Sequence, residues 1–341
     1  MGAHDSSFLR DASTSNSLAG NQYYNATVAL GAGIRLLQGQ VHYHDSQLRL
    51  CHTDCLLLDA GTLENWLSKI KFWLDDNPNE VITILLVNSD NKNASDFAAA
   101  FDGSGISEYG YSFPSDRSPT APSPTQDWPT LQEMITSDKR VVAFIASLAY
   151  SPDHPYLLSE FDHVFENDYD VRSLSNFSCS LDRPEGRRDN TSTAGADAAA
   201  RQGMMPLINH FAYQEIISGV LELPDVANID TTNSPSNTTT GALGRHLNNC
   251  TEQYNGVKPV FVMVDFYDKG PAIEAADHLN GIVPTGRKAS TSSANGASSG
   301  AASGPRWMSM VGVSERTNGR GGVVGVVALV TFLAVVVVVM V

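Results

Sequence analysis

The sequence predicts an α/β protein with a parallel sheet, either a closed barrel or an open doubly wound sheet. Apolar segments of strand length alternate with segments of helical periodicity along most of the chain. The run at 80–87 is almost continuously apolar, as is typical of a strand buried on both faces of a parallel sheet. With 341 residues, the chain is long enough for one large barrel and extensions.

The expected elements follow one another mostly as strand and then helix. Strands are expected within 31–41, 47–52, 80–87, 140–146, 163–166, 204–209 and 259–265. Helices are expected at 63–76, 130–137, 193–202, 241–249 and 271–280. The helix at 63–76 has the clearest pattern, because Thr62 is a favourable N-cap and the apolar residues recur on one face. The Ser-, Pro- and Gly-rich segment 103–129 predicts a long surface loop.

Composition restricts the partners and the compartment. The formal net charge of −15 argues against a nucleic-acid partner and against electrostatic attachment to an anionic lipid surface. Four cysteines permit two disulfides, and we expect the pairs Cys51–Cys55 and Cys179–Cys250 from their spacing in an oxidising compartment. Glycosylation sequons begin at Asn25, Asn93, Asn176, Asn190, Asn237 and Asn249. Together these features favour the secretory route over a cytosolic protein with buried thiols.

The C-terminal part of the sequence differs in composition from the rest. We expect a barrel domain over 1–285, a Ser-, Gly- and Ala-rich linker over 286–322 and a membrane segment over 323–341. The last segment is uncharged, and as a helix it would reach ~28 Å, close to the thickness of a hydrocarbon core. It predicts a membrane-associated protein at the cell surface. The attachment is either a glycosylphosphatidylinositol anchor added near Gly312 or a single C-terminal helix.

The N-terminal part predicts a strand that is unusually short. Only Met1, Gly2 and Ala3 precede the polar motif that begins at His4, whereas a typical strand has ~5 residues. No basic region followed by an apolar run is present near Met1 to serve as a secretory signal. We therefore expect the coding sequence to continue upstream, with the remainder of strand one and a signal peptide.

Three motifs are specific enough to indicate a family. They are GAHDSSF at 2–8, the segment 31–87 with GIRLLQ and LCH, and VMVDFYDKGPAIEAADHLN at 262–280. Covering about a third of the chain, they resemble the X domain of phosphatidylinositol-specific phospholipase C. The combination of LCHTDC with FVMVDFYD is most similar to the fungal phospholipase C-like phosphodiesterases. The resemblance implies a TIM-type (β/α) barrel with an incomplete first strand. It also implies a phosphoric diester hydrolase acting on a phosphoinositide or on a related phospholipid or glycolipid head group.

The resemblance also implies roles for four residues. His4 matches the general base that acts on the inositol 2-hydroxyl, and His52 matches the acid that protonates the leaving alkoxide. Asp5 matches the carboxylate beside that acid, and Asp265 matches the one that orients the base. The chemistry is reasonable on its own terms. Two imidazoles with ordinary pKa values near ~6.5 can divide proton removal and proton donation near neutral pH, and a carboxylate behind each fixes its tautomer.

The sequence departs from the family pattern on the second strand. Gln38 and Gln40 stand where bacterial relatives carry an aspartate and a phosphate-binding arginine, and where calcium-dependent relatives carry acidic ligands. Both are expected to contact substrate, but an amide brings no charge. We therefore expect no metal and no cofactor. A catalytically silent surface protein that keeps the barrel as a binding module remains an alternative, and a metal-dependent enzyme fits poorly.

Other polar residues have more than one interpretation. Asn209 and His210 are candidates for the pocket wall, and a structural His210 is an equal alternative. His42 and His44 alternate on one strand face, but two ligands are too few for a protein zinc site, so we expect a polar barrel mouth.

Overall fold

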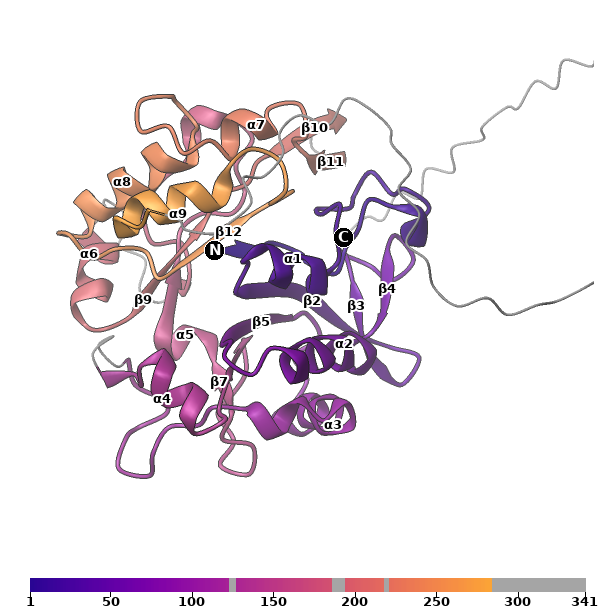
Figure 1. The fold of residues 1–341 in the computed structure, drawn as a ribbon. Helices are drawn as coiled ribbons and strands as arrows, with labels where there is room; N and C mark the ends of the chain where they lie inside the picture. Colours follow the sequence, from indigo (N-terminus) through magenta and orange to yellow (C-terminus); the bar gives the residue numbers. More distant parts are fainter. Residues whose placement is uncertain (123–126, 186–193, 218–220, 284–341) are drawn as a thin grey trace, which may run out of the picture. The chain divides into compact units, whose positions relative to one another are not determined.

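In the computed structural model of the chain, residues 1–283 are described, apart from 123–126, 186–193 and 218–220. Parallel strands form one curled sheet, and helices cover its outer face (Figure 1). The strands run in the order β7-β6-β5-β2-β1-β12-β9-β8. Their bounds are β1 Gly2–Ala3, β2 Leu36–His44, β5 Ile82–Asn88, β6 Val141–Ala146, β7 Leu157–Ser159, β8 Val164–Glu166, β9 Met205–Asn209 and β12 Phe261–Val264. The α/β class and the barrel type of fold are thus confirmed.

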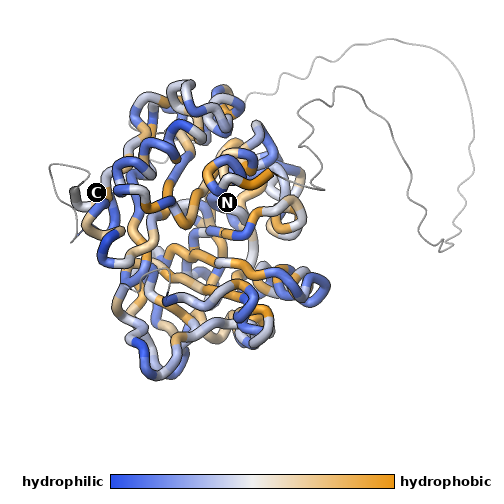
Figure 2. The backbone as a smooth tube through the Cα atoms, turned by 60° about the vertical axis from the view of Figure 1, so that its left-hand side comes forward, coloured by the Kyte–Doolittle hydropathy of each residue, from blue (hydrophilic) through white to orange (hydrophobic). Residues whose placement is uncertain are grey.

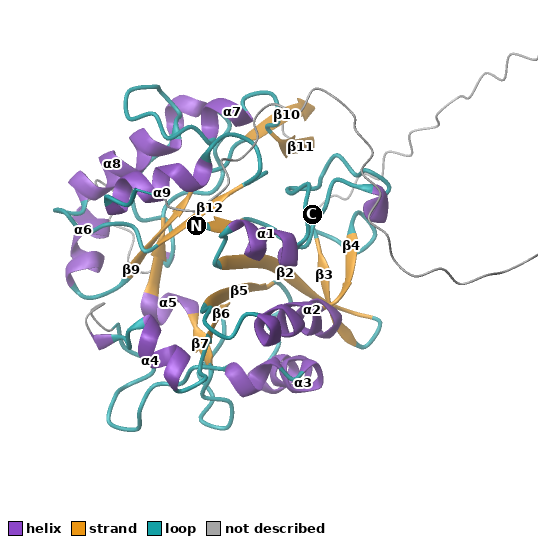
Figure 3. Cartoon of the chain, in the orientation of Figure 1, coloured by secondary structure: helices purple, strands orange, loops and turns teal. Residues whose placement is uncertain are grey.

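The helices lie outside the strands, as Figure 3 shows. Their bounds are α1 Ala26–Ala32, α2 Leu63–Asp76, α3 Ala94–Ser104, α4 Leu131–Thr136, α5 Glu160–His163, α6 Ala194–Arg201, α7 Ile229–Thr232, α8 Leu243–Gln253 and α9 Ala272–Asn280. Local capping explains where several begin. Thr62 accepts a hydrogen bond from the Asn65 amide at the start of α2, and Thr130 forms a capping box with Glu133 at the start of α4.

Two antiparallel pairs accompany the parallel strands, and only one of them joins the main sheet. β3 (Gln47–Cys51) pairs with the far end of β2, and β4 (Asp59–Thr62) pairs with β3. β10 (Tyr213–Ile217) and β11 (Leu221–Pro224) form a separate hairpin after β9. The first pair matters for the site, because the chain leaves β3 directly at His52.

Side-chain alternation along the strands creates two apolar layers. The larger layer lies between sheet and helices and includes Leu37, Ile84 and Val264. The smaller layer fills the barrel interior and includes Leu36, Leu85, Phe144, Leu207 and Met263. In Figure 2 the hydrophobic colours concentrate in the central strands and the hydrophilic colours in the surrounding segments. On the inward faces, the next side chains toward the C-terminal strand ends are polar, namely Gln38, Asn209 and Asp265.

The first strand is as short as expected, and it still pairs with both neighbouring strands. Gly2 is in register with Met263 of β12 on one side and with Leu36 of β2 on the other. The Met1 carbonyl also accepts hydrogen bonds from the Arg35 and Leu36 amides. The barrel is open elsewhere, because among the described residues no ladder joins β7 to β8. The single turn of α5 connects those two strands.

Several elements differ from the sequence-based expectation. The segment 31–41 contains the end of α1 before β2 begins, and helix α3 was not anticipated. The expected loop at 103–129 includes a short 3₁₀ helix at Ile106–Tyr109. Both expected disulfides are present, with Cα separations of 4.7 Å for Cys51–Cys55 and 5.2 Å for Cys179–Cys250.

The expected linker and membrane segment, 286–322 and 323–341, lie outside the described residues. Within the part of the chain that is described, no helix combines the length and apolar character needed to cross a membrane.

Candidate active site

His4 and Asp265 come together because the two strands that carry them are neighbours. His4 follows β1, Asp265 follows β12, and the His4 amide donates to the Val264 carbonyl at 3.0 Å. The Nδ1 atom of His4 lies 2.8 Å from Oδ1 of Asp265. His4 is 6% exposed and Asp265 2%, so this pair is shielded from water. A donor bond from Nδ1 to Asp265 leaves Nε2 of the neutral ring as a proton acceptor.

One carboxylate oxygen lies close to both imidazoles. Asp5 Oδ2 is 3.5 Å from Nε2 of His4 and 3.5 Å from Nε2 of His52. Asp5 is fully buried and has a φ of 45°, a left-handed backbone conformation that is uncommon outside glycine. Its Oδ1 atom is buried and has no hydrogen-bond partner among the described residues. The two rings and this carboxylate therefore face one another at the C-terminal mouth of the barrel.

Gln38 and Gln40 hold Asp5 in this position. Gln38 Oε1 accepts a hydrogen bond from the Asp5 amide at 2.6 Å, and Gln40 Nε2 donates to Asp5 Oδ2 at 2.9 Å. Gln40 Oε1 in turn accepts from the Thr53 amide at 3.0 Å, next to His52. Both polar atoms of the Gln40 amide and the Oε1 atom of Gln38 are thus engaged with the site residues.

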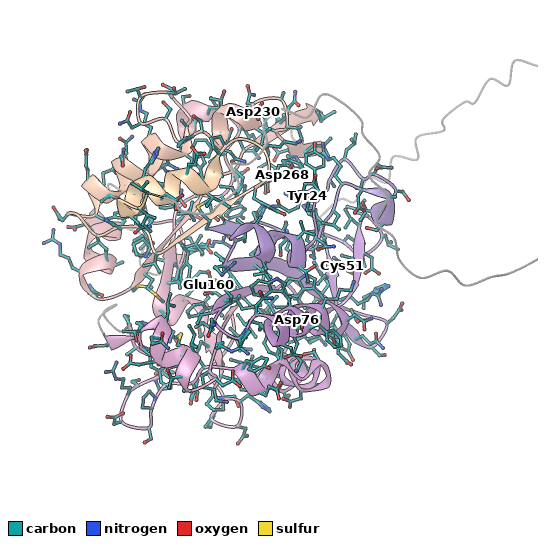
Figure 4. The ribbon with its side chains drawn as sticks, viewed as in Figure 1. Tyr24, Cys51, Asp76, Glu160, Asp230 and Asp268 are labelled. Carbon is teal, nitrogen blue, oxygen red and sulfur yellow. A yellow bond between two sulfur atoms is a disulfide. The ribbon has the colours of Figure 1, made fainter. Side chains whose placement is uncertain are left out.

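His52 is fixed by the segment that follows β3. Its backbone amide donates to the Leu58 carbonyl at 2.9 Å, and the Cys51–Cys55 disulfide closes the chain around it (Figure 4 labels Cys51). The Phe8 ring makes an edge contact with the imidazole, with centroids 5.1 Å apart. The His52 side chain is 17% exposed, which places it on the solvent side of the pair.

The surroundings shift the proton affinities of His4 and Asp265. Burial lowers the pKa of His4, but the charges of Asp5 and Asp265 outweigh it, so the pKa is raised above its ordinary value. Burial raises the pKa of Asp265, although the His4 and Asn21 contacts partly oppose the shift. Both shifts favour keeping a proton on the pair.

Three further residues support His4 and were not anticipated from sequence. Asn21 Nδ2 donates to Asp265 Oδ1 at 3.1 Å, and Gln22 Nε2 donates to the His4 carbonyl at 2.7 Å. The Phe211 ring stacks on the His4 ring, with centroids 3.7 Å apart and planes 7° apart. These contacts depend on tertiary folding, and no local sequence signal marks them.

With this geometry described, comparison with known proteins becomes informative. The PI-PLC X family profile matches residues 1–280.

The chain belongs to the PI-PLC X family.

Two relatives come from the fungus Arthroderma benhamiae. One, a PI-PLC X domain-containing protein 1, is 34% identical over 284 residues and shares 83% of this chain and 84% of its own length. The other, an uncharacterized secreted protein, is 35% identical over 293 residues. That alignment spans 84% of this chain but only 61% of the relative. A solved phosphatidylinositol-specific phospholipase C from Listeria monocytogenes is 18% identical, with a TM-score of 0.49 over 82% of this chain and 90% of that chain.

The two remaining pocket candidates of this PI-PLC X protein lie on opposite faces of their strand. Asn209 faces inward and donates from Nδ2 to Glu166 Oε2 at 3.2 Å. His210 lies on the helix side, where Nδ1 is 2.8 Å from Nδ1 of His246 and Nε2 is 2.8 Å from the Thr232 carbonyl. The structure thus places Asn209, but not His210, on the side of the predicted catalytic residues.

The histidines at 42 and 44 do not form a metal-binding group in the described residues. His42 Nδ1 lies 3.5 Å from Asp90, and His44 Nε2 lies 3.5 Å from Asp45. Within the described residues, the group whose ligand atoms lie close enough to hold a metal is Cys179, His246 and Cys250. Its two cysteines are joined in a disulfide. A metal-free site remains a prediction.

Proposed function

We propose that this PI-PLC X protein is a phosphodiesterase that cleaves a phosphoinositide, or a related lipid head group, by metal-independent acid–base catalysis. The observation that carries the proposal is the position of Asp5 Oδ2, 3.5 Å from Nε2 of both His4 and His52. Two imidazoles that face the same small region can serve the attacking and the leaving oxygen of one phosphodiester. The family to which the chain belongs supports the phosphodiesterase class.

In this mechanism His4 acts as the base. Its Nε2 atom takes the proton of the inositol 2-hydroxyl, and the hydroxyl oxygen forms a bond to phosphorus. Asp265, on the Nδ1 side at 2.8 Å, holds the tautomer that leaves Nε2 free and stabilises the imidazolium that forms.

His52 acts as the acid in the same step. As the phosphorus–oxygen bond to the lipid breaks, His52 gives its proton to the departing alkoxide. The products are a cyclic phosphodiester and a diacylglycerol, so atoms and charge balance without an added reagent. Asp5 stabilises the protonated form of each ring in turn.

A catalytically silent binding protein is the second candidate, and a specific observation favours it. Gln38 and Gln40 bring no charge, and their amides already bond to Asp5 and Thr53. Charge stabilisation of the transition state is usually a large contribution, on the order of 3 kcal/mol for one neutral donor. A protein without another cation near the phosphate would bind lipid without turning it over.

A head-group release assay distinguishes the two candidates. Vesicles of phosphatidylinositol, phosphatidylcholine and phosphatidylethanolamine would be incubated with the protein, with and without a chelator. We expect release of water-soluble phosphate from phosphatidylinositol that is unchanged by the chelator. No release from any vesicle would favour the silent protein, and loss of release with chelator would contradict the metal-free mechanism.

We also propose that the protein acts at the cell surface and is held there through 323–341, either by a glycosylphosphatidylinositol anchor added near Gly312 or by a spanning helix. The two disulfides and the secreted relative support an extracellular location. C-terminal peptide mapping of the mature protein distinguishes the attachments. A peptide ending near Gly312 indicates the anchor, and an intact peptide from 323–341 indicates the helix.

A further inference from the structure

A short segment of chain lies along the open edge of the barrel. Beside β8, the Glu166 amide donates to the Arg183 carbonyl at 2.9 Å, and the Asp182 amide donates to the Glu166 carbonyl at 2.7 Å. This antiparallel bridge occupies the side of β8 that does not pair with β9. The sequence gives no indication of it, because 17 residues separate Glu166 from Arg183.

The bridge brings a guanidinium to the end of β8. Arg183 Nη2 donates to Oε2 of Glu166, and its guanidinium carbon lies 4.5 Å from the centroid of the Tyr169 ring. The Nε atom of Arg183 is buried and has no hydrogen-bond partner among the described residues. The Arg183 side chain as a whole is 27% exposed, so it is only partly buried.

Glu166 connects this guanidinium to the catalytic candidates. Its Oε2 atom also accepts a hydrogen bond from Asn209, which is two residues before Phe211 on β9 and its extension. Phe211 stacks on His4, and Glu166 is one of the charges that raise the pKa of His4. Residues two apart on an extended strand are about 7 Å apart and share a face, so Arg183 lies on the His4 side of the barrel mouth.

Among the carboxylates of this region, Glu166 is the one that forms an ion pair with Arg183. Glu160 is 1% exposed (labelled in Figure 4), and burial together with the neighbouring Glu166 charge raises its pKa well above the ordinary value, which favours its neutral form. The positive charge of Arg183 is therefore opposed mainly by the carboxylate of Glu166. Asp5 and Asp265 add negative charge next to His4, whereas Gln38 and Gln40 add none.

We infer that Arg183 binds the phosphate of the substrate head group and supplies the positive charge that the second strand lacks. The inference rests on the proposed function. Glu166 and Tyr169 position the guanidinium, and the planar fork of donors suits a phosphate group, which a lysine would bind through a single point charge. Glu166 also competes with the phosphate for the same cation.

Because of that competition, substitutions of Arg183 and Glu166 should change phosphate affinity in opposite directions. Calorimetric titration with myo-inositol 1-phosphate would compare the full-length wild type with Arg183→Lys, Glu166→Gln and Arg35→Lys. Arg35, which immediately precedes β2, is the matched control. Its side chain is 32% exposed and also forms an ion pair with one glutamate, Glu80. Melting temperatures would show which variants are folded.

We expect Arg183→Lys to weaken binding of the inositol phosphate about tenfold, because lysine cannot form the bidentate contact with a phosphate. We expect Glu166→Gln to tighten it about threefold by removing the competing carboxylate, and Arg35→Lys to change nothing. The inference is overturned if Arg183→Lys binds like the wild type, if Glu166→Gln weakens binding as Arg183→Lys does, or if the wild type does not bind the probe.

Phospholipid turnover separates this inference from the proposed function. Binding that depends on Arg183 without head-group release from any vesicle would support the phosphate site and contradict the enzyme. Turnover with unchanged kcat and KM in Arg183→Lys would support the enzyme and contradict the phosphate site.

Discussion

Asp265 Oδ1 lies 2.8 Å from Nδ1 of His4, although 261 residues separate the two in sequence. The pairing of β1 with β12 creates this contact at the start and the end of the barrel. It determines which nitrogen of His4 faces Asp5 and His52.

The first prediction concerns the pH dependence of turnover. A general base must be deprotonated, and the pKa of His4 is raised above 6.5, so kcat/KM should fall as the pH drops through a value above 6.5. Asp265→Asn removes one of the charges that raise this pKa. Its acidic limb should therefore move to lower pH, and kcat should fall on the order of 10²-fold. A pH–rate profile measures both effects.

Asp268→Asn is the control for that prediction, because Asp268 is on the same segment and pairs with Lys269 rather than with His4. An acidic limb in Asp265→Asn that coincides with that of the wild type would contradict the assignment of His4 as the base.

The second prediction concerns Gln40. Its Nε2 atom donates to Asp5, so Gln40→Glu would replace a donor by a second carboxylate beside Asp5. We expect turnover to fall about 100-fold, since one charge-assisted hydrogen bond becomes a repulsion. Gln47→Glu, on the exposed start of β3, should keep wild-type rates. Equal rates in the two variants would show that Asp5 needs no support from Gln40.

The third prediction separates the two disulfides. Cys179–Cys250 closes a span of 71 residues, and Cys51–Cys55 closes a span of 4. By the chain-entropy relation their removal should cost about 4 and about 2 kcal/mol of unfolding free energy, respectively. Activity should follow the opposite order, because only Cys51–Cys55 adjoins His52. Denaturant unfolding and turnover of the two double-serine variants check this, and equal activity losses would contradict it.

The fourth prediction concerns two exposed leucines next to His52. Leu56 is 88% exposed and Leu57 71% exposed. If the substrate lies in a bilayer, changing both to serine should reduce turnover of vesicles about tenfold, since apolar surface no longer enters the lipid. Turnover of a short-chain monomeric substrate should not change. Phe72→Ser, at 70% exposure on α2, is the control, and equal losses on both substrates would contradict the interpretation.

The sequence predicts elements well where local and global signals agree. The helix expected at 63–76 is α2, because the Thr62 cap and the apolar face act together. The apolar run at 80–87 contains most of β5, which is covered on both faces. By contrast β7 has three residues and α5 has four, and neither was anticipated, because segments this short show little periodicity.

The site divides in a similar way. His4, Asp5, His52 and Asp265 carry motif resemblance, and the structure brings them together. Their catalytic roles remain predictions. The contact of Gln38 and Gln40 with substrate also remains a prediction. Their bonds to Asp5 could not be anticipated, because they depend on the register of β1 and β2. Arg183 reaches Glu166 through a bridge at a strand edge, and no sequence pattern encodes such a contact.

The most direct test of the account measures head-group release from phosphatidylinositol vesicles by His4→Ala, His52→Ala and the double variant. His278→Ala, on the exposed side of α9, is the control. We expect each single variant to lose nearly all turnover, the double variant to be little worse because the two act as a unit, and His278→Ala to behave like the wild type. Wild-type turnover in a folded His4→Ala or His52→Ala protein would contradict the acid–base mechanism.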